Sequence, residues 1–365
     1  MSPLRRSPLH ERHVALGAAM TPFAGWEMPL DYGSVVAEHR AVRESCGVFD
    51  LSHLGALRVT GLPAVTAVQW AFTNDAAALA VGRAHYTLCL DDRGGIVDDL
   101  LVYRLDWGFF VVPNAANSAA VFAVLEAAVA EAGACEVTDV KEGMACLAVQ
   151  GPRSAEMITS AGVDVSGLGY LDCRPLSLGS ARMPPGAGVL ARSGYTGERG
   201  YELFTPAALA PALWNRLVEA GARPAGLGAR DTLRLEMGYP LHGNDISTAT
   251  SPVEASLGWA VKVGAPFRGR GAYLRAQADE PSRRLWGLRA TGRGIPRAHC
   301  VVQQGGQAVG ETTSGTFSPT LRVGLALAYL DAAVTEGVEV EIDVRGKPLP
   351  AQVVKPPFID ADPRG

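Results

Sequence analysis

The alternation of apolar and polar positions along the chain predicts short strands joined by tight turns, with helices between them. In the clearest stretch, two apolar runs flank the turn residues DDRGG at 91–95, which indicates a hairpin. A third strand ends at Pro113, and a helix over residues 118–132 follows, with Asn117 or Ser118 as its cap. The three strands are expected at residues 84–90, 96–103 and 107–112. This order of hairpin, strand and helix is typical of an α+β module.

The segments on either side of this module differ in how clearly they are patterned. Up to Asp31 the chain carries four prolines, so this stretch is expected to be irregular. From Met144 onward strands and helices alternate again, which indicates a second α+β module. After Arg283 short strands and glycine turns predict a small β-barrel or sandwich. The other strands are expected at residues 54–60, 144–149, 188–192 and 201–204, and the other helices at 35–46, 63–72, from 153, 206–220 and 229–237.

Composition and charge favour a soluble, cytoplasmic enzyme and exclude several classes of protein. The 365 residues favour two or three domains, with 48% hydrophobic and 19% charged residues. A net charge of −4 and the lack of a basic run argue against nucleic-acid binding. No signal peptide and no membrane span are expected, because no apolar run is long enough. The six cysteines form no CxxC pair, which predicts reduced thiols and no metal site.

Two adjacent carboxylates, Asp98 and Asp99, lie in the second strand of the predicted hairpin, within GGIVDDL at residues 94–100. Side chains alternate along a strand, so the two groups face opposite sides and cannot form a dyad on one surface. Burial among apolar neighbours would raise the pKa of either group above its reference of about 3.9. The spacing alone favours a structural aspartate at the base of the hairpin over a catalytic one.

A second candidate site is the glycine-rich segment SGYTGERGYE at residues 193–202. Its glycines permit a close approach of the backbone to a ligand. Tyr195 and Tyr201 offer ring faces, and Glu202 offers a bidentate acceptor. The segment lacks the lysine and the spacing of a phosphate loop. A hairpin with exposed aromatic residues explains the same composition equally well.

A third candidate is GLGARD at residues 226–231, where a helix is expected to begin. A cation is disfavoured near a helix start, so Arg230 is a candidate binding residue, with a surface arginine as the alternative. Asp231 is favoured there and can pair with Arg234. His53 follows a serine, but GxSxG is absent and hydrolase chemistry has no support. The absence of GxGxxG argues against a Rossmann nucleotide site.

Several longer motifs, taken in order, resemble the glycine cleavage T-protein family within the folate-dependent T-protein superfamily. They are FAGWEMPL at 23–30, GVFDLSH at 47–53, GGIVDDL at 94–100, PNAAN at 113–117, VQGP at 149–152, GYTGE at 194–198, residues 226–236, TSGTFSPT at 313–320 and KPPF at 355–358. The resemblance runs from Pro8 to Phe358, nearly the whole chain.

This resemblance implies an α+β fold of three domains, a cloverleaf around a folate cavity. Two α+β domains are interleaved in sequence, and a β-barrel or jelly-roll-like domain follows them. The implied limits are residues 1–53 and 142–258 for domain 1, 54–141 and 259–282 for domain 2, and 283–365 for the barrel.

The resemblance also implies the activity of an aminomethyltransferase in one-carbon metabolism. Such an enzyme moves the methylene carbon from the aminomethyl-dihydrolipoyl arm of the H-protein to tetrahydrofolate and releases ammonia. Asp99 would be the catalytic residue, which orients the folate and stabilises developing positive charge. The implied folate-binding residues are Tyr86, Asn114, Tyr195, Glu202, Arg230 and Tyr239. No metal is required.

By the same resemblance, Glu202 suits the aminopyrimidine edge of the folate, and Arg230 suits an anionic or carbonyl group. Trp259 belongs either to the cavity wall or to the core. Leu54 and Ser193 depart mildly from the common pattern, where methionine and threonine stand.

His242 replaces a usual tyrosine and adds a titratable group near the expected folate wall, although a neutral change on the surface is favoured. Two other functions stay open. One is a paralogous tetrahydrofolate-dependent methyl or hydroxymethyl transferase or demethylase that acts on a small molecule. The other is a non-catalytic folate-binding protein.

Overall fold

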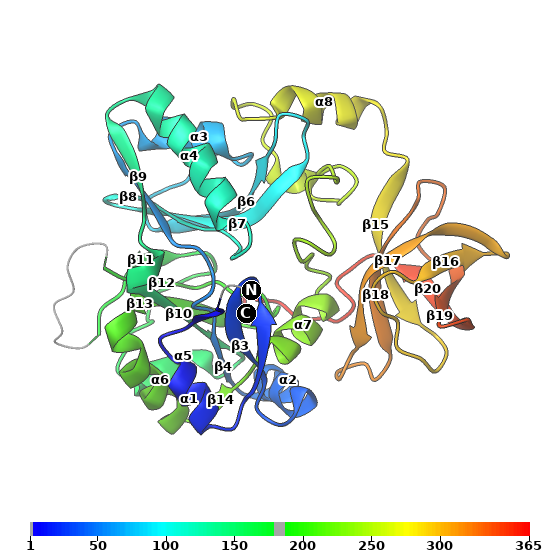
Figure 1. Ribbon diagram of the computed structural model, residues 1–365, viewed down its shortest axis with the longest axis horizontal. Coiled ribbons are helices and arrows are strands. Elements are labelled where there is room, and N and C mark those ends of the chain that lie inside the picture. The colour runs from blue at the N-terminus through cyan, green and yellow to red at the C-terminus, as the bar shows by residue number, and fades with distance from the viewer. Residues whose placement is uncertain (1–2, 179–186) are drawn as a thin grey trace.

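The computed structural model describes residues 3–178 and 187–365 and has three lobes (Figure 1). Two lobes each hold a β-sheet with helices against it, and the third lobe is a closed barrel. The predicted α+β class and the C-terminal barrel are therefore confirmed.

A six-stranded sheet forms the first lobe, in the order β11-β12-β13-β10-β4-β14. Its strands are β4 (Gly47–Asp50), β10 (Met144–Gln150), β11 (Cys173–Pro175), β12 (Val189–Ala191), β13 (Gly200–Pro206) and β14 (Arg223–Pro224), and helices α5 (Ser154–Ser160) and α6 (Ala210–Glu219) lie against it. Every residue of the apolar strand β10 is buried, as expected for a central strand. Ile158 and Trp214 join the two helices to one face. On the other face Phe204 packs edge-on against Phe110 of the second sheet, with ring centroids 5.0 Å apart.

The second sheet is antiparallel, in the order β6-β7-β8-β5-β9. Its strands are β5 (Leu57–Gly61), β6 (Arg83–Leu90), β7 (Ile96–Leu105), β8 (Gly108–Val112) and β9 (Cys135–Asp139), and its helices are α3 (Ala64–Ala71) and α4 (Ser118–Ala132). The predicted hairpin and helix are confirmed, and Asn117 occupies the N-cap position of α4 as one of the two predicted cap residues. Its side chain forms no capping hydrogen bond, because the Asn117 amide instead donates to Asp98. All five strands fall between β4 and β10 in sequence, so this sheet is an insertion into the first.

The stretch before Asp31, expected to be irregular, is in fact ordered. It forms β1 (Arg5–Arg6), α1 (His10–Ala15), β2 (Ala19–Phe23) and β3 (Trp26–Asp31), with the strands in the order β1-β3-β2. Pro29 pairs with Met20 beside an irregularity in the ladder, where a missing N–H is tolerated. Ala24 and Gly25, both at positive φ, make the tight turn between β2 and β3.

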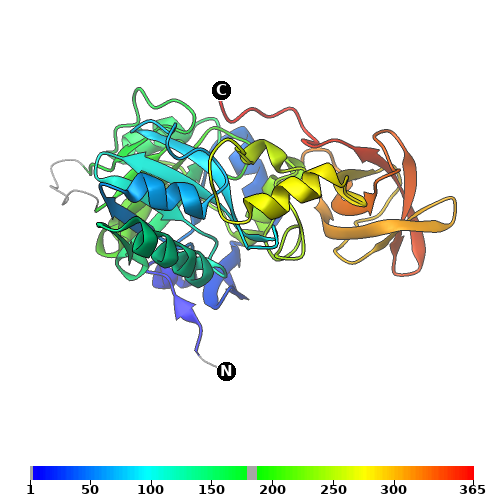
Figure 2. The ribbon, with the colours of Figure 1, turned by 90° about the horizontal axis from the view of Figure 1, so that it is seen from above.

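The barrel closes in the order β15-β18-β17-β16-β19-β20, which leaves no free edge. Its strands are β15 (Arg283–Ala290), β16 (Val301–Gln304), β17 (Gln307–Phe317), β18 (Gly324–Asp331), β19 (Glu339–Val344) and β20 (Lys347–Val354). Leu288, Val302 and Ile342 fill its interior at 0% exposure. From β20 the chain returns toward the sheet lobes (Figure 2), where Arg192 donates to the carbonyl oxygens of Arg364 and Gly365.

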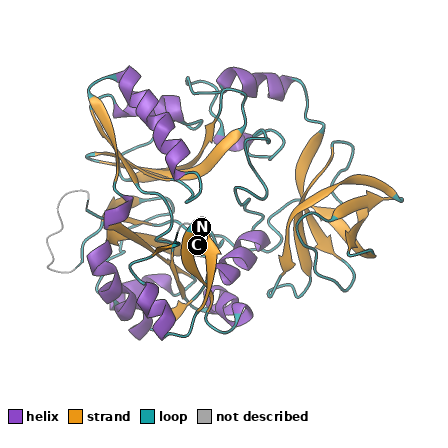
Figure 3. Ribbon diagram, in the orientation of Figure 1, coloured by secondary structure: helices purple, strands orange, loops and turns teal. Residues whose placement is uncertain are grey.

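Three further helices lie outside these layers, and α8 lies between the second sheet and the barrel (Figures 1 and 3). They are α2 (Val35–Glu44), α7 (Leu227–Glu236) and α8 (Arg270–Ala278). Ser34 caps α2, because its hydroxyl accepts a hydrogen bond from the amide of Ala37. The predicted helices over 35–46 and 229–237 are confirmed, the latter beginning two residues earlier at Leu227. Helix α8 was not predicted.

None of the helices in residues 3–178 and 187–365 combines the length and apolar character that crossing a bilayer requires. The six cysteines are free thiols, as predicted, and four of them are buried.

Candidate functional site

A cavity of about 1560 Å³ lies where the two sheets, helix α7 and the barrel meet. Its lining runs in sequence from Thr21 to Arg364. All seven residues singled out by the resemblance line it: Tyr86, Asp99, Asn114, Tyr195, Glu202, Arg230 and Tyr239. The fold thus gathers the predicted site residues in one place, although their roles stay predictions.

Asp99 faces this cavity from the middle of β7. The Tyr86 hydroxyl donates to Asp99 Oδ2 at 3.0 Å, and the Asn114 amide donates to Oδ1 at 3.0 Å. Burial raises the pKa of Asp99, while the Tyr86 bond, the charge of His242 and the Asn114 bond lower it. A desolvated carboxylate in a fixed orientation is suited to hold a proton or a developing positive charge.

Asp98 points to the opposite side of β7 and is fully buried. The backbone amide of Asn114 donates to Asp98 Oδ2 at 2.9 Å, and the Asn117 side chain donates to Oδ1 at 2.7 Å. Burial and then the charge of Asp99 raise the pKa of Asp98 to about 8, while the donors of Asn117 and Asn114 lower it. Asp98 therefore fixes the loop after β8, which brings Asn114 to Asp99.

Two aromatic rings stack on the same wall. The ring centroids of Tyr86 and Trp259 are 5.2 Å apart, and the ring planes differ by 22°. Trp259 is 61% exposed and lines the cavity. The prediction that it belongs to the cavity wall is therefore confirmed, and the alternative that it belongs to the core is wrong. Such a pair offers a flat apolar surface to a flat ligand.

Glu202 lies on β13, opposite Ala148 of β10, and is buried. Its Oε2 accepts hydrogen bonds from Tyr103 at 3.0 Å and from Ser193 at 2.5 Å. No side chain in the described part of the chain donates to Oε1. One oxygen is thus held in place and the other is free to accept a ligand N–H.

Arg230 is a cation without a hydrogen-bond partner for its guanidinium among the described residues. Its guanidinium lies 4.6 Å from the centroid of the Tyr195 ring, and burial lowers the pKa of Arg230. The alternative of a surface arginine is therefore wrong. Tyr195 is itself fixed, because its hydroxyl donates to the carbonyl of Pro240. Five free N–H donors favour a carbonyl or anionic group on the ligand.

Two residues are placed differently from their prediction. Tyr201 is 0% exposed within the core of the first sheet and offers no ring face to the cavity, because it alternates with the inward Glu202. His242 lines the cavity instead of the outer surface, and its Nε2 lies 3.0 Å from the carbonyl oxygen of Ile96. The predicted pair of Asp231 with Arg234 is confirmed at 2.8 Å.

Comparison with known proteins adds the decisive observation. Residues 9–265 match the GCVT N-terminal domain, and residues 283–360 match the glycine cleavage T-protein C-terminal barrel domain. The chain belongs to the glycine cleavage T-protein family.

Relatives in this family cover the whole chain. It is 51% identical to the aminomethyltransferase of Frankia alni, over 100% of both chains. It is 45% identical to that of Mycobacterium tuberculosis, over 98% of this chain and 97% of the other. The crystal structure of the glycine cleavage system aminomethyltransferase T from Bartonella henselae superposes with a TM-score of 0.92. That structure is 37% identical and covers 98% of this chain and 99% of its own.

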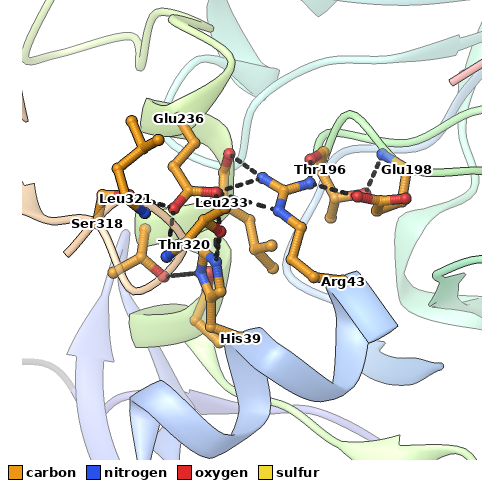
Figure 4. Close-up of polar contacts among 11 residues, drawn as sticks. His39, Arg43, Thr196, Glu198, Leu233, Glu236, Ser318, Thr320 and Leu321 are labelled. Atoms are coloured by element: carbon orange, nitrogen blue, oxygen red, sulfur yellow. Dashed lines mark hydrogen bonds and ion pairs between the residues drawn. The ribbon is translucent and has the colours of Figure 1, made fainter. Parts of the chain in front are cut away.

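In this T-protein family member a buried polar network holds the cavity walls together (Figure 4). Arg43 of α2 donates to the Thr196 carbonyl at 2.6 Å and to Glu198 at 2.9 Å, which secures the loop next to Tyr195. Its other nitrogens reach Glu236 at the end of α7, at 2.8 and 3.1 Å.

Glu236 extends the network to the barrel. Its carboxylate accepts from Ser318 at 2.5 Å and from the Thr320 hydroxyl at 3.0 Å, and it lies 3.3 Å from His39. Burial opposes its ionisation, but His39, Ser318 and Arg43 outweigh this and lower the pKa of Glu236 to about 2. One carboxylate therefore links α2, α7 and the barrel.

Sequence reasoning missed part of the cavity lining. Strand β2 and the turn after it contribute Thr21 to Ala24, in a stretch expected to be irregular. His53 and Tyr103 also line the cavity and were not singled out as binding residues. In residues 3–178 and 187–365 no group of three or more Cys, His, Asp or Glu side chains is placed to hold a metal ion.

Proposed function

We propose that this aminomethyltransferase moves a methylene carbon from the aminomethyl-dihydrolipoyl arm of the lipoylated H-protein to tetrahydrofolate, with release of ammonia. The observation that supports it most is the set of groups in one cavity. A carboxylate with a raised pKa, a glutamate with a free oxygen and an arginine without a hydrogen-bond partner all line it. This set matches a ligand that is flat, carries N–H groups beside a carbonyl and reacts through a nitrogen.

The donor set fits tetrahydrofolate, which supplies the nitrogens that take up the carbon. Oε1 of Glu202 can accept from the aminopyrimidine edge, because its other oxygen is already held. The guanidinium of Arg230 can donate to a carbonyl or carboxylate oxygen. The stacked rings of Tyr86 and Trp259 offer a surface to the flat parts of the molecule. No metal takes part in this proposal.

Asp99 is the proposed catalytic residue. Tyr86 and Asn114 hold its two oxygens, so the carboxylate keeps one orientation toward the cavity. In a dry site a fixed negative charge stabilises positive charge on a reacting group much more than it would in water. Asp99 therefore acts through position and charge, without a covalent bond to the substrate.

We also propose the division into residues 1–53 with 142–258, 54–141 with 259–282, and 283–365. The two sheets support it, since every strand of the second sheet lies within 54–141. A cytoplasmic location stays a prediction.

The test supplies purified enzyme with aminomethylated H-protein and tetrahydrofolate and measures ammonia and methylenetetrahydrofolate together. Both products should form in equal amounts. Asp99→Asn should abolish turnover and retain folate binding, because it removes the charge and keeps the shape. Asp92→Asn, on the exposed turn of the same hairpin, is the matched control and should keep full activity.

Folate binding without turnover of the aminomethylated H-protein would refute the proposal that the H-protein is the one-carbon donor. This outcome would favour a small-molecule donor. Equal loss of turnover from both variants would refute the role of Asp99.

A further inference from the structure

His53 has no polar partner, although it is buried against the cavity. Its side chain follows β4 in the loop to β5, is 3% exposed and lines the cavity. Nδ1 is closed off from solvent and has no hydrogen-bond partner. Nε2 also forms no hydrogen bond within residues 3–178 and 187–365, but it is not closed off from solvent. Buried polar groups are normally paired, so an imidazole with neither nitrogen paired calls for a partner at Nε2, the nitrogen that is not closed off.

The His53 ring forms no hydrogen bond of its own, and hydrogen bonds of the neighbouring residue Ser52 fix its position. The Ser52 amide donates to Asp50 at 2.8 Å, and the Ser52 hydroxyl accepts from the Cys146 amide at 3.1 Å. Lys141 donates to the Ser52 carbonyl. Next to these anchors, Phe23 packs edge-on against the imidazole with centroids 5.3 Å apart. The imidazole is therefore preorganised before any ligand arrives.

The surroundings of His53 set its protonation state. Burial, followed by the charge of Arg230, lowers the pKa of His53 to about 3, so the ring is neutral at neutral pH. A neutral imidazole has one N–H donor and one acceptor nitrogen. Unpaired buried N–H groups are rarer than unpaired acceptors, so we assign the proton to Nε2, on the open side.

We propose that His53 is a further ligand-contacting residue, which donates from Nε2, together with Arg230, to one carbonyl or carboxylate oxygen of the bound folate. The inference rests on the proposed function and deepens it. Both donors line the same cavity without protein partners, and the charge of Arg230 acts on the His53 ring, so we place them in one subsite for a single oxygen. Neither donor is an acceptor, so the subsite rejects an N–H group at the same position.

The subsite predicts opposite effects on stability and on binding. Without ligand, an unpaired imidazole nitrogen destabilises the fold, so His53→Leu should leave the melting temperature unchanged or raise it. With ligand, the same variant loses a hydrogen bond, so its Kd should rise about 3- to 10-fold. A histidine with only a structural role would lower stability when it is replaced.

The experiment measures Kd by calorimetry with 5-formyltetrahydrofolate as a chemically stable probe. His53→Gln places a donor near the Nε2 position and should keep most of the affinity, whereas His53→Asn reaches only the Nδ1 position and should behave like His53→Leu. His10→Leu is the matched control, because His10 is also buried and its Nδ1 forms no hydrogen bond, but it does not line the cavity. Its Kd should equal that of the unaltered enzyme.

Histidine-labelled ¹⁵N spectra add a direct readout. The resonance that is missing in the spectrum of His53→Gln belongs to His53. It should shift when the probe is added, whereas the His10 resonance should not. If the unaltered enzyme binds the probe and His53→Leu binds it equally well, this inference fails while the proposed function stands. If the unaltered enzyme does not bind the probe, the proposed function fails. Parallel losses of melting temperature and affinity in all three His53 variants would overturn the inference in favour of a structural role.

Discussion

The buried carboxylate of Glu236 makes the sharpest prediction about stability. Glu236→Gln keeps the size of the side chain and removes the charge that binds Arg43 and faces His39. The amide also presents N–H groups where the carboxylate accepts from Ser318 and Thr320. We expect a loss in the free energy of unfolding and a looser attachment of the barrel to α7.

The magnitude follows from the pKa of Glu236, which falls from 4.5 to about 2 on folding. A shift of that size corresponds to about 3 kcal/mol of stability, in line with the cost of removing one partner of a buried ion pair. The folded pKa is the lower one. The contribution is therefore complete above about pH 4.5 and is lost as the pH falls toward 2.

The assay compares thermal unfolding of the unaltered protein and of Glu236→Gln at several pH values. For 365 residues melting as one unit, about 3 kcal/mol corresponds to a drop of about 4 °C at pH 7. The drop should shrink steadily between pH 4.5 and pH 2. Glu126→Gln, on the exposed side of α4, is the control and should change the free energy by at most about 0.5 kcal/mol. An equal drop at pH 3 and pH 7 would refute the reasoning, as would a Glu236 variant as stable as the control.

Three further substitutions test the cavity wall. Tyr86→Phe removes a hydrogen bond that lowers the pKa of Asp99, so the acidic limb of the kcat/KM profile should move to higher pH; an unmoved limb would count against an ionised Asp99. Trp259→Ala should weaken folate binding about 3- to 10-fold in calorimetry and hardly change the melting temperature, because the ring is 61% exposed; a large drop in stability would contradict this. Asn117→Ala leaves Asp98 with one donor fewer and should lower the free energy of unfolding by about 1–3 kcal/mol with turnover kept, which denaturant titration and product assays would check.

The parts of the fold that the sequence could predict are those with a strong local pattern. The hairpin around residues 91–95 and helix α4 are stabilised by alternation and spacing within a few residues of each other. The β2–β3 hairpin is different. Its prolines oppose a strand locally, and only pairing in a three-stranded sheet, with an irregularity at Met20, makes the structure favourable.

The candidate site shows the same limit. Strand alternation alone separates Asp98 from Asp99, and the position of Arg230 near a helix start marks it as unusual. By contrast, alternation puts Tyr201 on the face opposite Glu202, but it does not show that helices α5 and α6 cover that face. His242 reaches the cavity through a long loop, so its place depends on packing between segments about 146 residues apart.

The spread of the cavity along the chain affects how the protein is made. Its walls include both Thr21 and Arg364, so they assemble only after Arg364 has been synthesised. At about 5–20 residues per second the ribosome needs roughly 20–70 s between these two positions. The two sheets must therefore fold and wait without help from any ligand. A ligand that binds in this cavity stabilises only those chains that have been synthesised as far as Arg364, by mass action. Under the proposed function, the supply of folate would therefore affect the lifetime of the protein against proteolysis as well as its rate of turnover.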